Sequence, residues 1–271
     1  MSWIRQPAVA GRFYPGDAAR LSDEVAGLLR SEASAAPALA VVAPHAGYLY
    51  SGAIAGQAFA RVQVPRTAIV LCPNHTGRGE RRSLWSSGAW LLPGAELPVD
   101  VDLAGELRRQ AGLADDQAAH HLEHAVEVQL PFLRARNPEV RTVPICLGGL
   151  TRVECLALGE RIAEVIADRR GEVLLVASTD FSHYLPADEA RALDLLAIDR
   201  IRAVDPEGLF DTVQAREISM CGYVPTTVVL AAARALGARS AELVRYGNSG
   251  ETSGDFDQVV GYGGLTVPMP G

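Results

Sequence analysis

The sequence predicts a single-domain α/β fold, with a mainly parallel central sheet flanked by helices. Three stretches, at 39–45, 68–75 and 172–184, begin with short apolar runs that have the length and composition of strands buried on both faces. Helical patterns alternate with them, which is typical of a parallel sheet. Each stretch ends in polar residues that include a histidine. Because ligands bind beyond the carboxyl ends of parallel strands, a functional site is expected there.

The other elements are expected from hydrophobic spacing and from capping residues. Asp17, Ser51, Thr151 and Asp205 each precede a helical pattern and are plausible N-caps. Further strands are expected at 141–147, 241–246 and 258–267, with one or two more in 83–92. Helices are expected at 17–31, 51–61, 101–111, 123–136 with an interruption near Pro131, 151–169, 187–204, from 205 onward, and 221–236.

Composition limits the class of protein. The chain has 271 residues, of which 48% are hydrophobic and 21% charged, and it suits one domain over 1–271. The net charge of −7 argues against a nucleic-acid-binding protein. We find no apolar run long enough to span a membrane and no signal-peptide core, so we expect a cytoplasmic protein. Whether the protein forms an oligomer is left open.

His45 and His75 are the first candidates for metal ligands, because neutral imidazole at a strand end is a frequent ligand. Cys221 begins the helical pattern 221–236, and the partial positive charge at a helix start favours the thiolate. Two imidazoles and a thiolate suit zinc, ferrous iron or copper. The alternatives are histidines that only bond to the backbone and a thiol that only packs. The other three cysteines, which lie inside apolar patterns, are expected to be buried free thiols: Cys72, Cys146 and Cys155.

Asp180 and His183 follow the third apolar run and are candidates for catalysis. Three residues apart, they suit a general base and the acid that orients it. They could also extend the metal's ligand shell, or be a helix cap and a surface histidine. Tyr48 and Tyr50 could line a pocket or simply cover the sheet.

A dense cluster of histidines and acids lies at 120–127. Its order does not match the HExxH zinc motif. His124 and Glu127 could share a helix face and contact the substrate or support the ligands. His120 and His121 are equally compatible with a solvated helix start.

Several motifs together resemble the Memo family, whose bacterial and archaeal members are often called AmmeMemoRadiSam system protein B. They are RQPAVAGRFYP, APHAGYLYSG, CPNH, EHAVEVQLPFL, STDFSHY, MCGYVPTTVVL and YGNSGETSGD, and they cover nearly the whole chain. The resemblance implies an α/β fold shared with class III extradiol ring-cleaving dioxygenases, which hold ferrous iron with two histidines and a carboxylate. In Memo-like proteins the equivalent positions are two histidines and a cysteine, here His45, His75 and Cys221. His183 falls where the dioxygenases place a catalytic base, with Asp180 beside it.

The cysteine changes what the resemblance implies about function. A thiolate in place of a carboxylate alters the charge and redox behaviour of iron, and it also admits copper and zinc. Ring cleavage is therefore not implied. The leading hypothesis is a redox protein with iron(II) or copper. The alternatives are a non-catalytic metal- or peptide-binding protein that uses the same cleft, and a zinc-dependent hydrolase with His183 as base. Whether the ligand is a small molecule or a peptide stays open.

Overall fold

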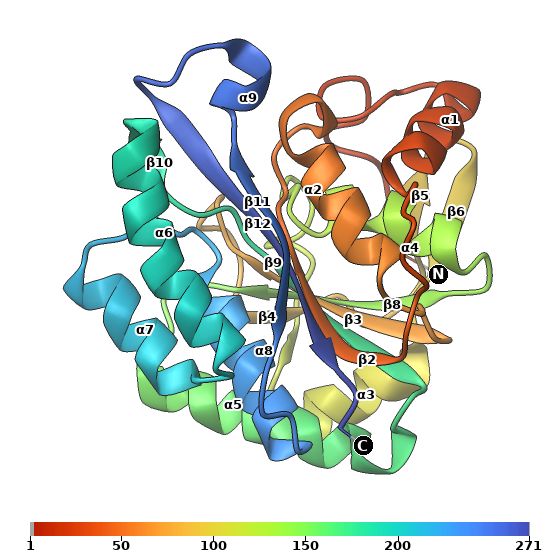
Figure 1. The fold of residues 1–271 in the computed structure, drawn as a ribbon. Coiled ribbons are helices and arrows are strands. Elements are labelled where there is room, and N and C mark those ends of the chain that lie inside the picture. The colour runs from red at the N-terminus through yellow and green to blue at the C-terminus, as the bar shows by residue number, and fades with distance from the viewer. Residues whose placement is uncertain (1–2, 271) are drawn as a thin grey trace.

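The computed structural model describes residues 3–270, and its core is a mixed sheet with four parallel strands at the centre (Figure 1). These strands are β2 (Ala38–Ala43), β9 (Val173–Ser178), β3 (Thr67–Pro73) and β8 (Arg141–Leu147), side by side in that order. Every residue of β2, β9 and β3 is buried, as expected for uninterrupted apolar runs. The predicted parallel centre is confirmed.

The edges of the sheet are largely antiparallel. β12 (Val259–Pro268) pairs with β2 and also with β11 (Glu242–Asn248) and β10 (His183–Leu185). At the opposite edge, β4 (Arg82–Leu84) pairs with β8, and β7 (Ala114–Asp115) runs parallel to β4. A separate three-stranded sheet contains β1 (Ile4–Arg5), β5 (Ala89–Leu92) and β6 (Ala95–Pro98).

Helices cover both faces of the central sheet (Figure 1). On one side, α2 (Tyr48–Ala60) packs on the sheet beneath α1 (Ala18–Leu28) and α4 (Leu130–Arg136). On the other side, α8 (Tyr223–Ala235) packs on β3 and β9 and contacts α5 (Arg152–Ile166) and α7 (Pro206–Ala215). Two further helices are α3 (Val101–Gln110) and α6 (Ala187–Arg202); α3 contacts α5, and α6 contacts β12. Short helical segments include α9 (Gly250–Ser253) and the 3-10 helix η2 (Ala167–Arg169). Within residues 3–270, no helix is long and apolar enough to cross a bilayer.

Three of the four predicted helix caps are confirmed. Asp17, Thr151 and Asp205 each accept a backbone N–H of the following turn, and Thr151 forms a capping box with Glu154. Ser51 is not a cap, because α2 begins three residues earlier after Gly47; its hydroxyl donates to the Ala46 carbonyl instead.

The predicted helix over 123–136 is wrong in its first part. Residues 117–126 form turns, and helical structure begins with the 3-10 helix η1 (Glu127–Gln129) followed by α4. The reason is Arg5, whose guanidinium donates to the carbonyls of His120 and Glu123. In a helix over 123–136 the Glu123 carbonyl would accept one of the first helical hydrogen bonds, and the buried arginine satisfies it in a turn conformation instead.

Candidate metal centre

The structure brings His45, His75 and Cys221 together. His45 and His75 follow the ends of β2 and β3, which flank β9, and Cys221 lies two residues before α8 begins. One ligand atom from each of the three lies within 4.8 Å of the others, and His45 Nε2 is 3.2 Å from Cys221 Sγ. The expected convergence is therefore found.

His45 is held by a buried hydrogen-bond chain. Its Nδ1 lies 2.9 Å from Ser178 Oγ, and the Ser178 hydroxyl donates to the Ala125 carbonyl at 2.7 Å. Because that bond uses the only hydroxyl hydrogen, Ser178 must accept from Nδ1–H and from Gln129 Nε2. His45 Nε2 therefore carries the lone pair that faces Cys221. Burial, with the neighbouring His75 charge, lowers the pKa of His45 to about 3, so the ring is neutral.

Glu123 holds His75 in the same way. Glu123 Oε1 is 2.9 Å from His75 Nδ1, and its other oxygen accepts the His75 backbone N–H at 2.7 Å. Burial acts to raise the pKa of Glu123, but the His75 hydrogen bond and charge outweigh it and lower that pKa to about 2. For His75 burial acts downward, and the Glu123 hydrogen bond still raises its pKa. The carboxylate fixes the Nδ1–H tautomer and leaves Nε2 available for a metal.

His124 adds a third imidazole to the site. Its ring stacks on His75 at a centroid distance of 4.9 Å and lies 5.3 Å from the His45 ring. His124 Nδ1 is 3.3 Å from Glu123 Oε1, the oxygen that His75 also contacts. Burial lowers the pKa of His124 to about 4, so it is neutral near pH 7. The sequence left its role open, and the structure assigns it to the wall of this centre.

Cys221 differs from expectation in its protonation. Burial, followed by the charge of Asp180, raises the pKa of the Cys221 thiol, although the Asp180 backbone N–H donates to Sγ at 3.3 Å. Proximity to the start of α8 therefore does not produce a thiolate without a cation. Binding of a metal would have to displace the thiol proton.

Asp180 and His183 are not arranged as a pair. Asp180 Oδ1 accepts the backbone N–H of His45 at 2.8 Å, and burial raises the pKa of this carboxyl. The His183 ring is fixed by Ser219, whose carbonyl lies 2.9 Å from Nδ1 and whose hydroxyl accepts the His183 backbone N–H. Because a carbonyl only accepts, Nδ1 carries the hydrogen and Nε2 is free to take a proton. Ser219 had no distinguishing signal in the sequence.

The rest of the 120–127 cluster lies outside the centre. Glu127 is buried and accepts from Arg5, from the Tyr14 hydroxyl and from two backbone N–H groups, so a substrate-facing role is wrong for it. His120 is buried between Trp85 and Trp90, which rules out a solvated position, whereas His121 is exposed. Cys72, Cys146 and Cys155 are buried free thiols, as expected.

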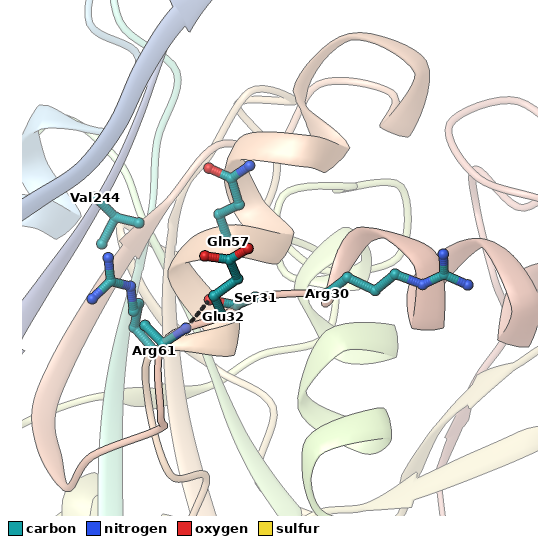
Figure 2. A pocket seen from close by; sticks show the side chains of 7 residues that line it. Arg30, Ser31, Glu32, Gln57, Arg61 and Val244 are labelled. Atoms are coloured by element: carbon teal, nitrogen blue, oxygen red, sulfur yellow. Dashed lines mark hydrogen bonds between the residues drawn. The ribbon is translucent and has the colours of Figure 1, made fainter.

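Cavity size does not locate this centre. A cavity of about 560 Å³ lies elsewhere, between the ends of α1 and α2 and β11, and contains no candidate ligand. Figure 2 shows that Arg30 points away from the other residues that line it. The chemistry of the side chains, rather than the volume of a hollow, therefore identifies the site.

The chain is similar to known proteins over nearly its whole length. MEMO1 family proteins of Methanothermobacter thermautotrophicus and Aquifex aeolicus are each 38% identical to the chain, over 97% of it and over 100% and 98% of their own lengths. That of Methanosarcina barkeri is 40% identical over 97% of this chain and 100% of its own length. A crystal structure of an uncharacterized protein of Escherichia coli K12, JW3007, matches with a TM-score of 0.55 at 15% identity, over 82% of this chain and 98% of that one. At that identity the match supports the fold alone, and it agrees with the α/β fold expected from the sequence. The family model for Memo-like protein matches residues 5–266, which include every residue of the centre described above, and the chain therefore belongs to the Memo family.

Proposed function

We propose that this protein binds one iron(II) or copper ion through His45, His75 and Cys221 and uses it for redox chemistry. The observation that carries the proposal is the convergence of one ligand atom from each residue within 4.8 Å. Both histidines use Nδ1 for a hydrogen bond inside the protein, so each has Nε2 left for a ligand bond. Such support of ligating histidines is the usual arrangement around protein-bound metals.

The donor set fits the proposed ions. Imidazole suits iron, copper and zinc, and a thiolate excludes the hard cations magnesium and calcium as preferred occupants. Three protein ligands leave coordination positions open, as in catalytic metal sites. Iron or copper bound there would supply one-electron chemistry.

His183 is the proposed proton-transfer residue of the site. Its Nδ1 is engaged by Ser219 and its side chain is partly exposed, so Nε2 can exchange protons with a ligand or with solvent. Asp180 is proposed to position the His45 backbone rather than to orient the His183 ring. By accepting the His45 N–H from a buried position, it fixes the backbone that carries a metal ligand.

Purification without oxygen, followed by elemental analysis and a measurement of oxygen consumption, tests this function. We expect iron or copper at about one ion per chain, with oxygen uptake on addition of a reductant. His45→Ala should lose the metal, whereas His121→Ala, at an exposed histidine, should retain it. Zinc without oxygen uptake would favour the hydrolase alternative, and a tightly held metal without any turnover would favour a binding protein. No bound metal after supplementation would overturn the proposal.

A further inference from the structure

Another pocket has a volume of about 300 Å³. Two of the residues that line it, Tyr50 and Tyr184, follow His45 and His183 closely in the sequence. Tyr50 lies in the first turn of α2, five positions after His45, and Tyr184 directly follows His183. The volume is at the lower end of the range for small-molecule sites. The residues of this tyrosine pocket that matter here are Tyr50, Tyr184, Tyr262, Ser249, Asp255 and Gln258.

Aromatic rings dominate the tyrosine pocket. Three of the seven tyrosines in the chain line it. Tyr262 is buried at 2% exposure, but Tyr50 is 42% and Tyr184 is 73% exposed. Burial raises the pKa of Tyr262, so its phenol stays neutral. Two of the three phenol rings, those of Tyr50 and Tyr184, are therefore accessible to a ligand.

The backbone at Tyr184 aims its ring in an unusual direction. Tyr184 has φ of 60°, a left-handed conformation that is unfavourable for a residue with a side chain. It sits in a bulge, because the register between β10 and β12 shifts between His183 and Leu185. In a regular strand, neighbouring side chains face opposite ways. Here the rings of His183 and Tyr184 are only 5.9 Å apart, so the bulge turns Tyr184 toward the side of the candidate base.

Residues 249–255, which include α9, form another wall of the tyrosine pocket. Hydrogen bonds join this segment to β12 and to α2. Ser249 exchanges hydrogen bonds with Val260, because its backbone N–H donates to the Val260 carbonyl and its hydroxyl accepts the Val260 N–H. The Thr252 hydroxyl donates to the Leu49 carbonyl, next to Tyr50. Figure 1 shows α9 beside the upper end of α2. The pocket is therefore formed by segments fixed to the sheet and to α2.

The tyrosine pocket is negatively charged. Asp255 is the charged residue among those that line it, and no lysine, arginine or histidine does so in the part of the chain that the structure describes. One Asp255 oxygen, Oδ1, accepts the Asp257 N–H at 2.9 Å, which orients the carboxylate without neutralising it. The negative faces of the phenol rings add to this potential. An anionic ligand is disfavoured here and a cation is favoured.

We infer that the tyrosine pocket binds an organic cation, a quaternary or protonated amine, with the rings of Tyr50 and Tyr184 on its faces and Asp255 as counter-charge. Aromatic faces and a carboxylate are the combination that recognises such groups. Tyr184 lies beside His183, so a ligand anchored there would be close to the candidate base. The binding itself needs no metal, so it stands apart from the redox function proposed above.

Choline and its uncharged isostere 3,3-dimethylbutan-1-ol are suitable probes, each titrated into the protein by calorimetry. We expect choline to bind saturably and the isostere to bind about tenfold more weakly. The protein is used as purified and again after treatment with a chelator, and the same choline affinity is expected in both. Equal affinity for the two probes, an absence of saturation, or a dependence on the metal would each overturn the proposal.

Substitutions then assign the binding to the tyrosine pocket. Tyr184→Leu should weaken choline binding about three- to tenfold, whereas Tyr184→Phe, which keeps the aromatic face, should bind like the wild type. Asp255→Asn should weaken it by a similar factor, with Asp199→Asn, at an exposed position on α6, as the matched control. Thermal melting confirms that each variant is folded. Unchanged affinity in folded Tyr184→Leu and Asp255→Asn would overturn this location.

Discussion

His75 Nδ1 lies 2.9 Å from Glu123 Oε1, and the His75 backbone N–H donates to the other oxygen of the same carboxylate. One buried side chain thus fixes both the ring and the backbone of a candidate ligand from a segment 48 residues away. Glu123 is itself held in place, because Arg5 binds its carbonyl and the Ala125 N–H donates to its carboxylate. The orientation of the centre therefore depends on residues that do not touch a metal.

Glu123→Gln is expected to weaken metal binding by about 10- to 100-fold, the usual effect of losing an outer hydrogen-bond partner. The amide cannot offer two acceptor oxygens, so one of the two His75 contacts must be lost. Competition titration with a metal chelator measures the change. Glu160→Gln, at an exposed glutamate on α5, is the matched control. Equal affinity in the wild type and Glu123→Gln would show that His75 needs no such support.

Cys221→Ser should reduce the affinity for copper and zinc by about tenfold or more, since it removes a ligand rather than a support. A hydroxyl is a poorer ligand than thiolate for these ions. Elemental analysis and chelator competition provide the readout, and Cys155→Ser, at a buried thiol away from the centre, provides the control. Retention of stoichiometry and affinity in Cys221→Ser would remove Cys221 from the ligand set.

His183→Ala should leave the metal content nearly intact, because the ligand atoms that converge within the described residues 3–270 belong to His45, His75 and Cys221 and not to His183. Any reaction of the protein should slow by about 10²–10⁴-fold, the usual contribution of one general acid or base. Elemental analysis and turnover rates are measured on the same preparations. Metal loss as severe as in His45→Ala would instead make His183 a ligand.

The sequence was sufficient to predict the strand ends, because the polar residues of the site directly follow the buried apolar runs. The apolar runs of β2, β3 and β9 identify buried strands, and the residues directly after them are near the site by topology alone. Asp17, Thr151 and Asp205 were predictable as caps for a similar reason, since their bonding partners lie within one turn of the chain.

The supporting contacts were not predictable in this way, because they join distant segments. Gln129 and Ser178 meet only when η1 packs against the end of β9, and Ser219 meets His183 from another loop. Arg5 changes a helix into turns from more than a hundred residues away. Local propensity carries no information about such partners, and hydrogen bonds that cross the fold decide the outcome at these places.

Arg5→Met should destabilise the protein by about 3–5 kcal/mol, because it leaves the Glu127 carboxylate buried without its cation. The double variant Arg5→Met/Glu127→Gln should lose less than the sum of the two single variants, since neither charge then remains. Denaturant unfolding measures all three, with Arg161→Met, at an exposed ion pair on α5, as the control. Strict additivity of the two changes would contradict a coupled buried pair.

His120 is expected to make the protein less stable in acid. Burial, with the charge of Arg5, lowers the pKa of His120 from 6.5 to about 3. Between these values the unfolded chain binds the proton and the folded chain does not. Its contribution is therefore fully present above pH 6.5 and is lost as the pH falls toward 3, by up to about 1.4 kcal/mol per pH unit. His120→Leu should flatten this loss between pH 6.5 and 4.5 in denaturant unfolding, and His121→Leu, at the exposed neighbour, should not. Parallel stability curves for wild type and His120→Leu would show that His120 does not cause the loss.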